Sequence, residues 1–189
     1  MGKKNKRDFL KGLKINPWEI EKEVKKFFNY KDCLVPESFK DQCSRKIVKA
    51  HTVPKSGSLK EIAHEGHVYS GQFDFTTLLE QEGVPKVSLV GINEASTFNG
   101  FCTNHDSKIF HDLEQKTFLG TKKQCFLIAF RALSRELYLK KSFVKTLDLY
   151  ISLAKSKKID PNLGDIFEAL KEGAILGLRD LSKYKKVFD

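Results

Sequence analysis

Apolar residues recur at helical intervals near the N-terminus and again through the last third of the chain. The first run covers about residues 16–29 and opens with a capping asparagine followed by proline. The later region opens with Thr121-x-x-Gln124, which has the pattern of a capping box. Apolar positions three or four apart then predict three long helices, which begin at Thr121, Ser142 and Asp160.

The middle of the chain alternates apolar and polar positions instead. Alternation predicts strands over residues 45–53, 73–79 and 84–92, with a further extended stretch at 67–70. The other elements expected here are a short helix from the Ser58-x-x-Glu61 capping box to Gly66, a polar loop over 91–100 and a helix over about 104–114.

These elements predict an α+β protein in three parts. Residues 1–15 form a basic flexible arm, residues 16–118 an α+β module with short antiparallel strands, and residues 119–189 a helical bundle. Three helices are few for a bundle that buries its own core. We therefore expect them to pack on the module, on a second copy or on sequence absent from this chain. The same helices are the candidate surface for a second copy or a partner protein.

Two Cys/His segments of the module carry the candidate chemistry. Cys102 and His105 are three residues apart at a predicted helix start, a spacing that lets both side chains reach one ion. Cys33 and Cys43 can complete a tetrahedral zinc set, although nine residues separate them, and His51 can replace one of them. Four protein ligands leave no open coordination position, so the predicted zinc is structural.

Composition narrows the class of protein. The chain has 189 residues with 40% hydrophobic content and 15 Phe, which allows a sizeable core. No apolar run approaches the roughly 18 residues of a membrane span, and no apolar segment follows the basic N-terminus as in a secretory signal. We expect a cytoplasmic protein, in which cysteines serve as metal ligands or core thiols. Cys125 follows the second pattern, because apolar residues surround it in the sequence.

Positive charge flanks the Cys/His region. The net charge is +10, distributed as +5 over residues 1–30, −2 over 31–120 and +7 over 121–189. This distribution is compatible with nucleic acid bound through the N-terminal arm and the C-terminal helices, and equally with an ordinary solvated surface. The candidate phosphate-binding residues are Lys3, Lys4, Lys6, Arg7 and Lys55.

The segments Lys-Ala-His-Thr-Val-Pro (49–54) and Asn-Gly-Phe-Cys-Thr-Asn-His-Asp (99–106), with Cys33 and Cys43 before them, resemble the HNH (treble-clef, ββα-metal) nucleases. They also resemble uncharacterised bacterial proteins with an N-terminal zinc module and a helical remainder. The resemblance covers about residues 31–115. It implies a zinc-bound treble-clef-like module that hydrolyses phosphodiesters with a divalent metal.

One zinc joining the two segments would bring His51 and Asp106 together. His51 is then the candidate general base, and Asp106 the candidate ligand of a catalytic Mg²⁺ or Mn²⁺. Two other interpretations stay open: a non-catalytic zinc module that binds nucleic acid or a partner protein, and a metal-free α+β protein. Further candidate histidines are His64, His67 and His111.

Overall fold

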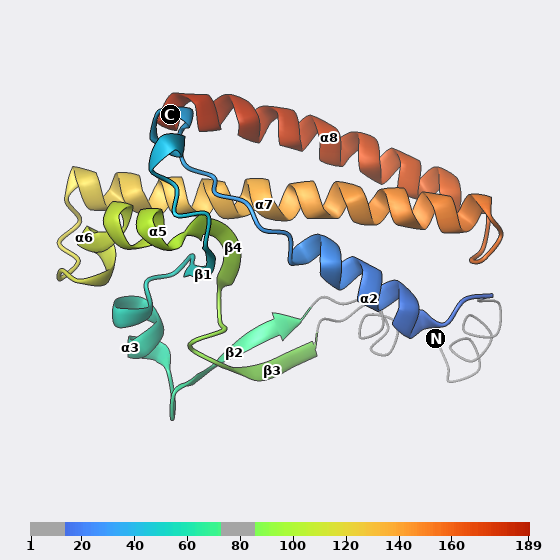
Figure 1. Cartoon of the computed structure of the whole chain (residues 1–189). Coiled ribbons are helices and arrows are strands. Elements are labelled where there is room, and N and C mark those ends of the chain that lie inside the picture. The colour runs from blue at the N-terminus through green and yellow to red at the C-terminus, as the bar shows by residue number, and fades with distance from the viewer. Residues whose placement is uncertain (1–13, 73–85) are drawn as a thin grey trace. The chain divides into compact units, whose positions relative to one another are not determined.

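The computed structural model describes residues 14–72 and 86–189 (Figure 1). The chain divides into two compact units. Of the described residues, unit 1 comprises 14–28, 71–72, 86–88 and 140–178, and unit 2 comprises 29–70, 89–139 and 179–189. The strand expected at 73–79 and most of the expected basic arm, including Lys3, Lys4, Lys6 and Arg7, lie outside the described residues.

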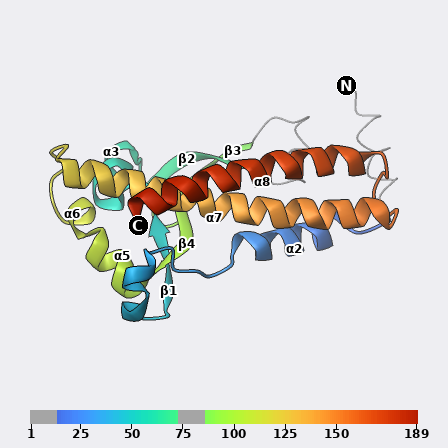
Figure 2. The same cartoon turned by 90° about the horizontal axis from the view of Figure 1, so that it is seen from above.

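Unit 1 is built on helices. Helix α2 (Pro17–Phe28) begins as predicted, because Asn16 Oδ1 accepts a hydrogen bond from the Trp18 backbone N–H at 3.0 Å. It lies along the C-terminal part of α7 (Lys122–Lys155), as Figure 2 shows. The core of this unit consists of Ile20, Leu153, Ala154 and Ile159, with Phe167 of α8 (Leu163–Phe188) packed against it.

The prediction of three long C-terminal helices is wrong, because α7 runs through Ser142 without a break. No Gly or Pro interrupts residues 122–155. Ser142 does not cap a new helix; its buried hydroxyl donates a hydrogen bond to the Phe27 carbonyl at 2.8 Å instead. The capping box at the start of α7 is confirmed: Gln124 N–H donates to Thr121 Oγ1 at 3.2 Å, and Thr121 N–H donates to Gln124 Oε1 at 3.4 Å.

Unit 2 is built on short elements. Strand β1 (Ile47–His51) pairs antiparallel with β4 (Thr97–Cys102), with Ile47 opposite Cys102 and His51 opposite Thr97. Helix α5 (Thr103–Ile109) follows β4 directly (Figure 1), and α6 (His111–Glu114) follows α5. The other short elements in unit 2 are η1 (Glu37–Gln42), η2 (Lys55–Leu59) and α3 (Lys60–Ile62). Strands β2 (His67–Gln72) and β3 (Lys86–Gly91) form a second two-stranded sheet.

The predicted polar loop over 91–100 is wrong at its end, because residues from Thr97 belong to β4. Gly100 is the source of the error. A Cβ at this glycine would lie 2.1 Å from the Phe98 ring, so the glycine allows close packing within a strand rather than a turn. Phe98 and Phe101 are both buried in the core of unit 2, with Phe110 and Tyr138.

Three further expectations need correction. The helix expected over 104–114 is broken at Phe110, whose buried ring contacts Phe101 at a centroid distance of 4.9 Å. Ser58 forms no helix cap, and α3 ends at Ile62 rather than Gly66. Cys125 is exposed and therefore not a core residue.

The observed class is α+β, with short antiparallel strands and a helical C-terminal part, as predicted. None of the helices in residues 14–72 and 86–189 has the length and apolarity that crossing a membrane requires.

Candidate metal centre

Cys33, Cys43, Cys102 and His105 come together in unit 2, with all four ligand atoms within 4.8 Å of one another. Cys33 and Cys43 lie on either side of η1, Cys102 ends β4, and His105 lies in the first turn of α5. All but Cys43 are buried. The predicted ligand set is thus assembled from segments that are far apart in the sequence.

The distances within this group are those of a metal site. His105 Nδ1 lies 3.4 Å from Cys33 Sγ, 3.5 Å from Cys43 Sγ and 3.3 Å from Cys102 Sγ. One ring nitrogen makes a single hydrogen bond, so hydrogen bonding does not account for three sulfur neighbours. Tetrahedral zinc, with Zn–S of about 2.3 Å and Zn–N of about 2.0 Å, separates sulfur from nitrogen by roughly 3.5 Å. The group can therefore hold a metal ion, and zinc fits it.

Backbone hydrogen bonds place Cys33 beside β4. The N–H groups on either side of it donate to this strand: Asp32 N–H to the Asn99 carbonyl at 3.2 Å, and Leu34 N–H to the Gly100 carbonyl at 2.9 Å. The Cys102 N–H in turn points at Cys33 Sγ at 3.3 Å. The ligand positions are therefore fixed by main-chain contacts and not only by the thiols.

Hydrogen bonds also set which thiol ionises first. Burial raises the pKa of Cys102, but the His105 N–H and the N–H and hydroxyl of Ser44 outweigh burial and bring the pKa to about 6. Burial raises the pKa of Cys33 to about 12. Cys102 is thus the thiolate of the group, and a bound cation would ionise the other thiols. Ser44 was not predicted as a supporting residue, since no local sequence signal marks a second-sphere hydroxyl.

His51 lies outside this group, at the end of β1. Its Nε2 is 2.8 Å from the Ile92 carbonyl oxygen. A carbonyl only accepts hydrogen bonds, so Nε2 carries the proton and Nδ1 of the neutral ring has a free lone pair. In this tautomer His51 Nδ1 can accept a proton.

Asp106 follows the ligand His105 in α5 and is half-buried. Burial raises its pKa, Arg131 and His51 oppose the shift, and Glu114 reinforces it. The expected proximity of His51 and Asp106 stays a prediction. Among the residues that the structure describes, the Cys/His group is the one set of three or more potential ligands, and it includes neither His51 nor Asp106.

Arg131 of α7 is the partner that holds Asp106. Its side chain is 1% exposed; one guanidinium nitrogen lies 2.6 Å from Glu114 Oε1 and another 3.6 Å from Asp106 Oδ1. The guanidinium also lies over the Phe110 ring, 4.0 Å from its centroid. Sequence reasoning missed Arg131, and the signal that marks it is a charge at a buried, helically spaced position between Leu127 and Ser134.

The remaining predicted residues lie elsewhere. Lys55 is exposed in η2, and the four basic residues of the arm lie outside the described part of the chain. His67 contacts the Glu65 carbonyl at 2.8 Å, and His111 contacts Asp112 at 3.5 Å. His64 pairs with His67 in an isolated bridge. No family model, curated protein or solved structure matches the chain.

Proposed function

We propose that this protein is a zinc-stabilised, HNH-like nuclease that hydrolyses phosphodiester bonds of nucleic acid with the help of a divalent metal. The observation that carries the proposal is the contact between His51 Nε2 and the Ile92 carbonyl at 2.8 Å, from which the neutral ring's other nitrogen, Nδ1, is inferred to be the basic one. The order β1, β4, α5 supports it, since the strand pair runs directly into the ligand-bearing helix.

In this proposal each residue has one task. Zinc on the three thiolates and His105 would keep the segment around η1, β4 and α5 together, and would supply no chemistry. His51 Nδ1 takes the proton from the attacking water. Asp106 would hold a Mg²⁺ or Mn²⁺ ion, which neutralises charge on the scissile phosphate when bound. Lys55 and the basic arm would contact the backbone phosphates.

The test is cleavage of single- and double-stranded DNA and RNA in Mg²⁺ or Mn²⁺ by wild type and by His51→Ala. Loss of a general base is expected to lower the rate by about 10²- to 10⁴-fold. The zinc content should stay the same, because His51 lies outside the ligand group. His67→Ala is the matched control, an exposed histidine that also contacts a carbonyl. Full metal-dependent cleavage by His51→Ala would remove His51 from the mechanism.

A second function, a non-catalytic zinc module, is favoured by one observation. Asp106 is already paired with the buried Arg131, and a divalent ion would have to compete with that guanidinium. Such a module would bind nucleic acid or a partner protein. Exposed apolar residues of α8 in unit 1, Ile166, Leu170 and Leu176, are suited to a protein partner or a second copy.

The two functions separate in a salt series. Binding of nucleic acid that weakens steeply with salt, without cleavage in any divalent metal, supports the module. Cleavage that depends on both His51 and the metal supports the nuclease.

A further inference from the structure

A cavity of about 570 Å³ lies in unit 2, between the η2–α3 segment and the α6–α7 connection. Its size is within the roughly 300–1,000 Å³ typical of small-molecule sites. One wall carries Ser56 and Glu61, and the other carries Leu113, Glu114 and Phe118. The walls are tied together by the Ser56 hydroxyl, which donates to the Glu114 carbonyl at 2.5 Å.

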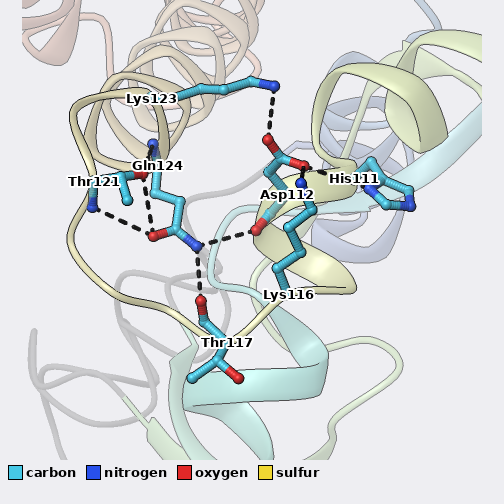
Figure 3. Close-up of polar contacts among 7 residues, drawn as sticks. All are labelled: His111, Asp112, Lys116, Thr117, Thr121, Lys123 and Gln124. Carbon is cyan, nitrogen blue, oxygen red and sulfur yellow. Dashed lines mark hydrogen bonds and ion pairs between the residues drawn. The ribbon is translucent and has the colours of Figure 1, made fainter.

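The aromatic residue on the rim is held in place while it faces solvent. Phe118 is 57% exposed. The residues on both sides of it bond to the side-chain amide of Gln124: its Nε2 donates to the Thr117 carbonyl at 2.9 Å, and its Oε1 accepts from the Leu119 N–H at 2.9 Å. Gln124 is 4% exposed and also bonds to Asp112 and Thr121, as Figure 3 shows. A solvated aromatic side chain on such a fixed backbone is suited to stacking.

Two carboxylates, those of Glu61 and Glu114, line the cavity. Glu114 pairs through Oε1 with Arg131, and its Oε2 lies 3.5 Å from Ser56 Oγ. Glu61 has no hydrogen bond or ion pair to any residue of the described ranges 14–72 and 86–189. Lys116, on the rim, pairs with Asp112 at 2.7 Å (Figure 3). The exposed Glu61 carboxylate is therefore available to accept hydrogen bonds, which disfavours a phosphate beside it and favours a neutral group rich in donors.

The outside of the η2–α3 wall is basic. Lys55 and Lys60 flank the segment that carries Ser56 and Gly57, and both are exposed. A ligand that combines a donor-rich, planar, uncharged part with a phosphate fits this pattern: the planar part enters, and the phosphate stays at the lysines. Nucleotides have this composition. Guanine alone among the standard bases presents two adjacent donors, N1–H and N2–H, to a carboxylate.

We propose that this cavity binds an unpaired guanine base, stacked on Phe118 with its N1–H and N2–H donated to Glu61. The guanine belongs to a free nucleotide or to a single strand. The single-strand form of the proposal rests on the proposed function, whereas the base pocket itself does not. Glu114 links this pocket to the nuclease site, since it shares Arg131 with Asp106.

The experiment measures affinity of the full chain for GMP, IMP and AMP by calorimetry. IMP lacks only the 2-amino group, so one lost donor to Glu61 should weaken binding about tenfold, and AMP should bind at least as weakly as IMP. Glu61→Gln should lower GMP affinity about tenfold and remove the preference over IMP. Phe118→Ala should lower affinity for all three by about tenfold.

One cavity-filling variant and two controls exclude a folding effect. Ser58 lines the cavity and is exposed, so Ser58→Leu should fill part of the cavity and abolish binding while the thermal unfolding curve is kept. Glu37→Gln and Phe39→Ala, exposed changes in η1 away from the cavity, should bind GMP as wild type does. Equal affinity for GMP and AMP, or wild-type affinity in Glu61→Gln, overturns the proposal.

A second arm identifies the source of the guanine. An unpaired guanine in a five-nucleotide strand should bind more tightly than GMP if the natural ligand is a single strand, and no more tightly if it is a free nucleotide. Either result supports the pocket. GMP binding in a protein that cleaves no nucleic acid would reject the proposed function alone, and cleavage without any guanine preference or GMP binding would reject the pocket alone.

Discussion

Buried polar groups have hydrogen-bond partners in the helices of unit 1, whereas several at the candidate metal centre of unit 2 do not. In unit 1, the buried hydroxyls of Ser142 and Thr146 donate to the carbonyls of Phe27 and Ser142, at 2.8 and 3.0 Å. In unit 2, His105 Nε2, Asp106 Oδ1 and Arg131 Nε are buried without a hydrogen-bond partner among the described residues. Native proteins tolerate few such atoms, and these three lie in and beside the ligand group.

The two units also differ in the length of their helices and strands. Helix α2 has 12 residues, α7 has 34 and α8 has 26, and an apolar core joins their portions in unit 1. In unit 2, β1 has five residues, β4 has six and α5 has seven. Elements of that length are marginal alone, since a helix below about 12 residues is barely stable in water. The comparison predicts that a bound ion adds more to the stability of the short elements of unit 2 than to that of the long helices of unit 1.

Removal of the metal should have the largest effect on the difference in stability between the two units. Chelation, or Cys102→Ser, should expose amides of β1, β4 and α5 to hydrogen exchange, while amides of α2 keep their protection. The expected loss is several kcal/mol or more in unit 2, because structural zinc contributes on the order of 10 kcal/mol in small zinc domains. Cys125→Ser is the matched control, since that exposed thiol lies outside the ligand group. Protection in unit 2 that survives complete metal loss would contradict the dependence.

Features set by local sequence signals could be predicted, whereas features set by tertiary packing could not. The helix of residues 17–28 and the start of α7 follow from local signals, namely helical spacing, a capping asparagine and a capping box. The ligand group was also predictable, because cysteine and histidine are rare and chemically distinctive. The position of β4 could not be predicted, because Asn99 and Gly100 are residues typical of turns, and packing against Phe98 overrides that local preference.

Long-range contacts explain the other failures. Ser142 has the local pattern of a helix start, but its partner is the Phe27 carbonyl, 115 residues away. The sequence around Arg131 does not predict that Asp106 and Glu114 are its partners, because these residues come into contact only when α5, α6 and α7 pack together. Local spacing is readable from sequence, whereas the partners of a buried polar group depend on tertiary structure.

Arg131→Met tests the buried network and should have the next largest effect. The change leaves Asp106 and Glu114 without their shared cation, which costs about 3–5 kcal/mol of the free energy of unfolding when a buried pair is broken. Urea titration of the metal-loaded protein measures the loss. Arg135→Met, whose guanidinium lies 3.5 Å from Glu136 with a side chain 35% exposed, should cost less than about 1 kcal/mol. Equal costs for the two variants would show that the network adds no stability.

Gly100→Ala should be destabilising by about 1–3 kcal/mol, because the added Cβ would lie 2.1 Å from the Phe98 ring. That ring has little freedom to move, with Tyr138 and Phe101 in edge contact at centroid distances of 5.6 and 5.8 Å. Thermal unfolding of the metal-loaded protein measures the effect. A neutral result would mean that β4 relaxes, and that its packing is looser than that of a close-packed strand.

The same substitution in α8 should have the opposite sign and the smallest size. Gly173 is exposed in the helix interior, and a Cβ there meets nothing within 4 Å. Gly173→Ala should therefore stabilise unit 1 by about 0.5–1 kcal/mol, since alanine loses less backbone entropy in a helix than glycine. Hydrogen exchange of α8 amides around residue 173 measures the gain. Destabilisation at this position would instead point to a contact that needs the glycine, such as a second copy packed on this face of α8, and concentration dependence of the exchange would distinguish that case.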